Sequence, residues 1–194
     1  MNPATALRLH HFEPLSLANG PGRRAVLWLQ GCTLACPGCF NPQTHPLEGG
    51  QQIAIADLLQ ELLLLRPTLD GLTISGGEPL LQLPALTNLL QALHRQTPLS
   101  VLLFSGFTWT QIQAMPGSQA LLAEVDVLLA GPYQAKQRLA HGLLGSANKT
   151  VHLLSSHYQL TDLQATPPAE VCIDETGQIV LSGIDPLTWN DHEL

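Results

Sequence analysis

Short apolar runs alternate with amphipathic stretches along most of this chain. The runs are bounded by Gly, Pro or polar residues, and continuous apolar segments of this kind are typical of strands that are covered on both faces. The ranges in which we expect such strands are 25–30, 71–75, 99–104, 125–129 and 149–154.

The stretches between these strands predict helices. Apolar residues recur at helical spacing over 53–65, where Pro67 ends the pattern, and over 84–94, and a short helix is expected from Thr108. The apolar face of the first helix consists of Ile55, Leu58, Leu59, Leu62 and Leu63. Strands that alternate with helices predict an α/β fold with a parallel sheet and right-handed crossovers.

Glycines directly follow the predicted strands. They are Gly31, Gly76 with Gly77, Gly106 and Gly131. Because ligands bind at the carboxyl ends of parallel strands, and these ends meet at one edge of a sheet, we expect a single site built from several loops.

The last segment has a different pattern. Thr166-Pro167-Pro168 predicts a short linker, and two apolar runs after it flank a turn in which Gly177 takes the left-handed position. We expect a β-hairpin over 169–184. Residues 1–165 would then form the core domain, and 166–194 an extension of the same domain.

Composition narrows the classes of function. The 194 residues are 45% hydrophobic but only 12% charged, and the net charge is −7. No basic field exists to attract a phosphate backbone, no apolar run has the length of a membrane span, and the N-terminus lacks the pattern of a signal peptide. We therefore expect a soluble, cytoplasmic protein that binds neither nucleic acid nor membranes.

Three of the four cysteines stand together in Cys32-Thr-Leu-Ala-Cys36-Pro-Gly-Cys39. Thiolates from one short loop favour an iron–sulfur cluster, and a 4Fe–4S cluster with three protein ligands keeps one iron open to a small molecule. Two other interpretations remain open: a zinc site completed by His45 or Cys172, and cysteines that bind nothing. In the predicted hairpin, we expect Cys172 to pack as a small apolar side chain.

The spacing CxxxCxxC after one strand and Gly-Gly-Glu after the next resembles the radical S-adenosylmethionine (radical SAM) superfamily. The runs Asn19-Gly-Pro-Gly-Arg23 and Cys36-Pro-Gly-Cys39-Phe-Asn-Pro42 are similar to those of the activating proteins of glycyl radical enzymes, nearest to the activating proteins of anaerobic ribonucleotide reductases. Ser105-Gly106-Phe107 and Gly145-Ser-Ala-Asn148 fit the same group. The resemblance covers residues 7–154.

The resemblance implies a partial (β/α) barrel of the radical SAM type that holds a 4Fe–4S cluster through Cys32, Cys36 and Cys39. Arg23 is a further candidate for contact with a carboxylate of SAM or of the substrate. The implied SAM-binding residues are Ser75, Gly76, Gly77, Glu78, Phe40, Ser105 and Asn148. The same positions also have structural interpretations, as a tight turn, ordinary packing or turn caps.

The implied reaction is reductive cleavage of SAM at the cluster, with an electron from an external donor. It yields methionine and a 5′-deoxyadenosyl radical that abstracts a hydrogen atom, here from a glycyl radical enzyme. The sequence assigns no catalytic side chain. One alternative is a small radical SAM enzyme that modifies a peptide or a small metabolite. An alternative of another class is a non-catalytic zinc or iron–sulfur adaptor, or an electron carrier.

Two positions depart from the pattern of the activating proteins. Ala130 stands where an acidic residue is common, and Leu144 stands where Arg is common before the Gly-Ser-x-Asn run. Both departures bear on the choice of partner more than on the chemistry of the cluster.

Overall fold

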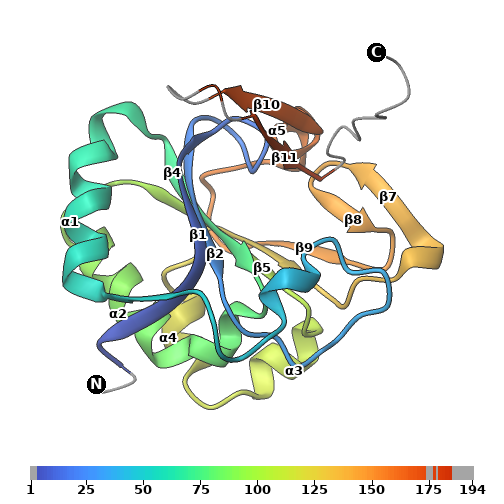
Figure 1. Ribbon diagram of the computed structural model, residues 1–194, viewed down its shortest axis with the longest axis horizontal. Coiled ribbons are helices and arrows are strands. Elements are labelled where there is room, and N and C mark those ends of the chain that lie inside the picture. The colour runs from blue at the N-terminus through green and yellow to red at the C-terminus, as the bar shows by residue number, and fades with distance from the viewer. Residues whose placement is uncertain (1–3, 174–176, 178, 185–194) are drawn as a thin grey trace.

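The computed structural model describes residues 4–173, 177 and 179–184 (Figure 1). Its main sheet has the strand order β3-β1-β2-β4-β5-β6-β9. Strands β2, β4, β5 and β6 are parallel, whereas β3 with β1, β1 with β2, and β9 with β6 pair antiparallel. The strands of this sheet are β1 (Ala6–Ser16), β2 (Arg24–Leu29), β3 (Gln51–Ala54), β4 (Gly71–Gly76), β5 (Ser100–Ser105), β6 (Val127–Ala130) and β9 (Thr150–Leu153).

Helices α1 to α4 cover one side of the sheet, whereas α5 and two hairpins lie toward its other side (Figure 1). No helix among the described residues is long and apolar enough to cross a membrane. The helices are α1 (Ile55–Leu65), α2 (Leu83–His94), α3 (Trp109–Ala114), α4 (Ser118–Leu122) and α5 (Leu160–Gln164). The hairpins consist of β7 (Arg138–His141) with β8 (Leu144–Ser146), and β10 (Ala169–Ile173) with β11 (Ile179–Gly183). Short 3-10 turns occupy Pro42–Thr44, Arg66–Thr68, Pro79–Gln82 and Ala135–Gln137.

The parallel strands are apolar on both faces because each face packs against a separate core. On β5, Val101 and Leu103 belong to the larger core, which α1 to α4 cover, whereas Leu102 belongs to a smaller core with Leu129 and with Leu163 of α5. Side chains of alternate residues point to opposite faces of a strand, so a continuous apolar run fills both cores.

These findings confirm the predicted α/β fold, the parallel pairing of β2, β4, β5 and β6, and the C-terminal hairpin. Gly177, in the predicted turn of that hairpin, has φ +86°. The predicted first helix begins at Ile55, because Ile53 and Ala54 belong to β3. The rest of the predicted turn, at 174–176, and the end of the predicted extension, at 185–194, lie outside the described residues.

The direction of β9 differs from the all-parallel expectation. Between β6 and β9 the described chain forms the β7–β8 hairpin and no α-helix, and a parallel return requires a longer crossover, usually a helix. The chain therefore comes back antiparallel, with Ala130 of β6 opposite Thr150.

Strand β1 was not predicted, because its polar residues break the alternation expected of a strand. Leu9 pairs with Leu29 and His11 with Trp28, which leaves His10 as an extra residue in a β-bulge. A bulge interrupts the period of two on which the sequence-based prediction relies.

Arg24, the first residue of β2, lies fully buried at the amino ends of the parallel strands. Its Nε donates a hydrogen bond to Thr73 Oγ1 at 2.6 Å, and its Nη2 donates to the carbonyl oxygens of Leu72 at 2.7 Å and Ser100 at 3.1 Å. Nη1 donates to the Tyr158 hydroxyl at 3.0 Å. Burial lowers the pKa of Arg24, yet a guanidinium remains protonated in proteins. A buried cation thus joins β2, β4 and β5 through neutral oxygens.

Replacing Arg24 with Met should lower the free energy of unfolding by roughly 3 kcal/mol or more, because buried carbonyl and hydroxyl acceptors lose their donors. Arg23→Met is the matched control. Arg23 is half exposed, and its Nε lies 3.6 Å from Asp70 Oδ2, an exposed ion pair worth less than about 1 kcal/mol. Anaerobic urea unfolding followed by circular dichroism measures both losses, and equal losses would contradict the assigned role of Arg24.

Candidate functional site

The carboxyl ends of the four parallel strands meet at one edge of the sheet. Hydrogen bonds between backbone groups join the loops that follow them. The Gly77 N–H donates to the Leu29 carbonyl at 2.8 Å, the Glu78 N–H to the Gly31 carbonyl at 2.9 Å, and the Gly131 N–H to the Phe107 carbonyl at 2.8 Å. The glycine-containing loops that follow the strands in sequence are therefore neighbours in space.

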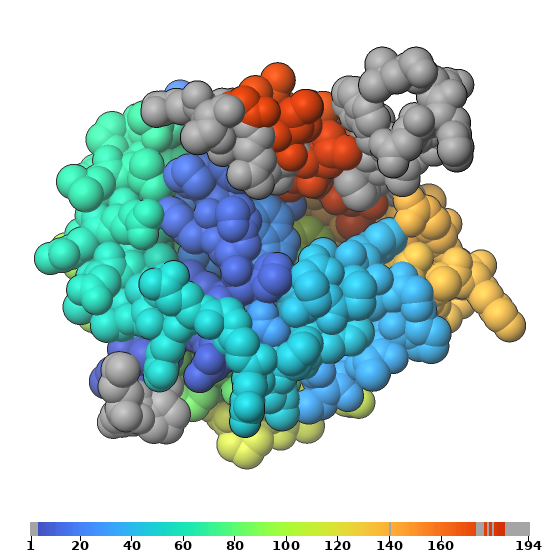
Figure 2. Space-filling view, viewed as in Figure 1, coloured from blue at the N-terminus to red at the C-terminus, as the bar shows by residue number. Residues whose placement is uncertain are grey.

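A cavity of about 480 Å³ opens at this edge, within the size range of small-molecule sites. Figure 2 shows the surface hollowed below β10 and β11, between this hairpin and the segment that follows β2. The cavity lining combines Cys32, Cys36 and Cys39 with residues after β4 and β5, and with Leu181–Ile184 of the C-terminal hairpin.

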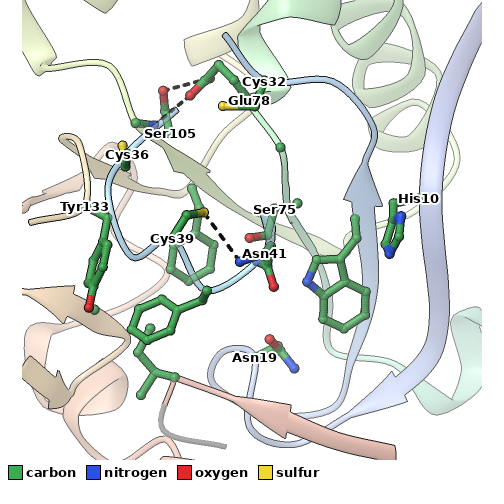
Figure 3. A pocket seen from close by; sticks show the side chains of 18 of the residues that line it. His10, Asn19, Cys32, Cys36, Cys39, Asn41, Ser75, Glu78, Ser105 and Tyr133 are labelled. Atoms are coloured by element: carbon green, nitrogen blue, oxygen red, sulfur yellow. Dashed lines mark hydrogen bonds between the residues drawn. The ribbon is translucent and has the colours of Figure 1, made fainter. Parts of the chain in front are cut away.

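The cysteine loop is irregular and anchored at its start. The Gly31 N–H donates to the Thr44 carbonyl at 2.8 Å, and the Cys32 N–H donates to the His45 carbonyl at 3.0 Å. Within the loop Ala35 has φ +46° and Gly38 has φ +72°, so the chain turns sharply before the second and third cysteines. Figure 3 shows Cys32, Cys36 and Cys39 around the same space.

The three cysteines have the chemistry that an iron–sulfur cluster requires. All three are half-buried free thiols, and Cys39 Sγ accepts a hydrogen bond from the Asn41 N–H at 3.4 Å. Burial raises the pKa of Cys39, the Asn41 N–H lowers it, and the neighbouring Cys36 and Cys32 raise it further. Three thiols that face one space, one of which accepts a hydrogen bond from a backbone N–H, fit a 4Fe–4S cluster.

A zinc site receives no comparable support. Within residues 4–173, 177 and 179–184, no group of three or more His, Cys, Asp or Glu side chains is arranged to hold a metal ion. Neither His45 nor Cys172 lines the cavity. Because each cysteine of a 4Fe–4S cluster binds its own iron, its ligands surround a cluster rather than a single ion, and they do not converge on one point.

The Gly76-Gly77 pair allows β4 to end against β2. Gly76 has φ +105°, and a Cβ on it would lie 2.3 Å from the Leu29 nitrogen. A Cβ on Gly77 would lie 2.3 Å from the Gly31 carbonyl oxygen. Any side chain here would separate the two strand ends, so the pair has a structural reason that is independent of a ligand. Ser75, Gly76 and Gly77 all line the cavity, as the SAM-binding expectation requires.

Glu78 is buried, and its carboxylate joins the loops that follow β4 and β5. Oε1 accepts hydrogen bonds from the Leu80 N–H at 3.0 Å and the Ser105 hydroxyl at 2.9 Å, and Oε2 accepts from the Gly106 N–H at 2.7 Å (Figure 3). Ser105 Oγ also accepts from the Phe107 N–H at 3.1 Å. Burial raises the pKa of Glu78, and the three donors oppose that shift. Glu78 and Ser105 therefore both line the cavity and are hydrogen-bonded to each other there.

The other predicted ligand residues have different positions. Phe40 lines the cavity, and its ring lies 4.6 Å from that of Tyr133. Asn148 does not line it; its Nδ2 donates to the Pro132 carbonyl at 2.8 Å, and its buried Oδ1 has no hydrogen-bond partner among the described residues. Arg23 also lies outside the lining and pairs with Asp70.

Several lining residues were not predicted as site residues. His10 and His11 lie in the cavity wall because the bulge in β1 brings both to it, and the His11 ring lies 5.5 Å from that of Trp28. Lys149 was also missed. Its signal in the sequence is its place directly after the Gly145-Ser-Ala-Asn148 run, at the start of a predicted strand.

A mostly parallel sheet with a cysteine triplet and a Gly-Gly-Glu turn at its carboxyl edge is the arrangement of a radical SAM-type iron–sulfur protein. The family model described as a 4Fe-4S single cluster domain matches residues 18–152. The chain belongs to this family.

Named relatives are similar to the chain over different lengths. The anaerobic ribonucleoside-triphosphate reductase-activating protein of Vibrio cholerae is 32% identical, over 75% of this chain and 97% of the relative. Pyruvate formate-lyase-activating enzymes of Clostridium pasteurianum and Staphylococcus aureus are 41% and 42% identical, over 46% and 42% of this chain, and the matches span 39% and 34% of those enzymes. The crystal structure of QueE from Escherichia coli is 17% identical, with a TM-score of 0.42 over 53% of this chain and 54% of that one.

Ser105→Ala should lower the free energy of unfolding by about 1–2 kcal/mol, because Glu78 loses a donor and the Phe107 N–H loses its acceptor. Ser156→Ala, at an exposed position, is the control and should change it by less than about 0.5 kcal/mol. Anaerobic urea unfolding of both variants checks this prediction, which a silent Ser105→Ala variant would refute.

Proposed function

We propose that this protein is a radical SAM enzyme that binds a 4Fe–4S cluster through Cys32, Cys36 and Cys39, cleaves SAM reductively and activates a glycyl radical enzyme. The single observation that carries the proposal is the meeting of the cysteine triplet and the Gly-Gly-Glu turn at one cavity. Membership of the 4Fe–4S family and the names of the relatives support it.

When bound, the cluster and SAM supply one-electron cleavage of the sulfonium and the radical chemistry that follows. The chain's own contribution is to bind and orient. Ser75, Gly76 and Gly77 present a wall with little side-chain bulk, so that a ligand can approach the backbone closely. Glu78 fixes the loops after β4 and β5 relative to each other, which keeps this wall rigid.

The aromatic and apolar side of the cavity would exclude water from the reacting atoms. Phe40 and Tyr133 pack against each other, and Leu181 and Ile184 of the C-terminal segment complete this side. A low-polarity wall protects a reactive species from solvent.

The names of the relatives support a protein substrate. The relative from Vibrio cholerae is an activating protein of a reductase, and this chain spans nearly all of its length. We infer that the glycine backbone of a partner enzyme is the substrate and that an external low-potential donor supplies the electron.

The cysteine assignment predicts a sharp split among the four thiols. Anaerobic reconstitution with iron and sulfide should load the wild-type protein, which should form 5′-deoxyadenosine from SAM after reduction. Cys32→Ala, Cys36→Ala and Cys39→Ala should each abolish that product. Cys172→Ala should retain it, because Cys172 lies on β10 outside the cavity lining. Product from any triplet variant would overturn the assignment.

Activation of a partner is tested separately. The loaded protein is incubated anaerobically with SAM, a reductant and an anaerobic ribonucleotide reductase or pyruvate formate-lyase, and a glycyl radical is sought by EPR. We expect the radical signal with the wild-type protein and none with Cys36→Ala. SAM cleavage without a glycyl radical in any partner would leave the chemistry in place but contradict the activating role.

A further inference from the structure

Lys149 has an unusual place in the cavity wall. It directly precedes β9, beside the carboxyl end of β6, because Thr150 pairs with Ala130. Its Nζ donates a hydrogen bond to the carbonyl oxygen of Gly131. Gly131 has φ +122°, which residues with side chains rarely adopt, so a glycine is needed where the strand ends against Lys149.

The charge of Lys149 has no close counter-ion. Lys149 is the only Lys or Arg among the described residues that line the cavity, and the ion pairs within the described part of the chain do not include it. Burial lowers the pKa of Lys149, whereas Glu78, Cys36 and Cys39 raise it. A partly buried ammonium group thus shares the cavity lining with Glu78, Cys36 and Cys39.

We propose that the positive charge of Lys149 raises the reduction potential of the cluster bound by Cys32, Cys36 and Cys39. This inference rests on the proposed function. Reduction would add one electron, and hence one negative charge, at the cavity that Lys149 lines together with the three cysteines. A cation stabilises the more negative state, and its effect is larger in a partly buried site than in water.

The negative charge of Glu78 is the reason why a positive charge is needed in the cavity. Its buried carboxylate shares the cavity wall with the cysteines and, when ionised, opposes the addition of an electron. Without Lys149, the described lining would hold three thiolates and a carboxylate but no Lys or Arg. The external donor would then have to be correspondingly stronger.

The test is an EPR-monitored redox titration of the reconstituted protein, with dithionite as the one-electron reductant. Lys149→Met should move the midpoint potential to more negative values, a decrease of roughly tenfold in the equilibrium constant for reduction. Lys149→Arg keeps the positive charge and should stay within about twofold of the wild type. Lys136→Met, which removes a solvent-exposed charge, is the matched control and should also stay within about twofold.

Three results would overturn the inference. They are an unchanged midpoint potential in Lys149→Met at full iron content, equal shifts in Lys149→Met and Lys149→Arg, and a loss of SAM affinity without a shift in potential. If Lys149→Met takes up less iron than the wild type, Lys149→Gln replaces it in the same titration, because Gln keeps a donor for the Gly131 carbonyl. A wild-type protein that assembles no cluster would overturn the proposed function as well, so the two failures are distinguishable.

Discussion

The parallel register of β2, β4, β5 and β6 is the constraint on which the site depends. It places Leu29 beside Gly76, and Ser105 beside Ala130, so four loops must share one small space. A register shift of one residue would turn every side chain of a strand to the other face, which would exchange the two cores and move the loops. The absence of side chains at Gly76 and Gly77 lets the first two strand ends touch, and the Glu78 carboxylate then joins the loops after β4 and β5.

Charged groups are few in this chain, and among the described residues Arg24 and Glu78 are buried and Lys149 is partly buried. Arg24 lies at the amino ends of the parallel strands, and Glu78 and Lys149 lie at the carboxyl ends. Neutral partners solvate all three: oxygens bond to Arg24, N–H and hydroxyl donors bond to Glu78, and a carbonyl bonds to Lys149. Neutral dipoles offset the cost of burial without cancelling the charge. The fields of Glu78 and Lys149 therefore extend into the cavity, where a charged cofactor would experience them.

The sequence predicts what depends on continuous patterns. Strands β2, β4, β5 and β6 are apolar on both faces, and glycines after them mark the edge where the loops meet. Strand β1 escapes prediction because the bulge at His10 breaks its alternation, and the direction of β9 depends on a connection whose hairpin carries no clear pattern. Neighbouring residues also differ in ways that a pattern cannot reveal: Arg23 is at the surface and Arg24 in the interior, and Asn148 lies outside the lining that contains Lys149.

The structural role of the Gly-Gly-Glu turn is compatible with the ligand role that we propose for it. A carboxylate offers about four acceptor positions, and the N–H groups of Leu80 and Gly106 and the Ser105 hydroxyl occupy three of them. The hydrogen bonds of the described residues leave one acceptor position of the carboxylate without a donor. Because the other three hold the carboxylate still, that position is fixed in space before a ligand arrives, which lowers the cost of ordering the site on binding. An ammonium group of an amino-acid ligand is the kind of donor that such a position accepts best, because its positive charge would pair with the negative charge of the buried carboxylate.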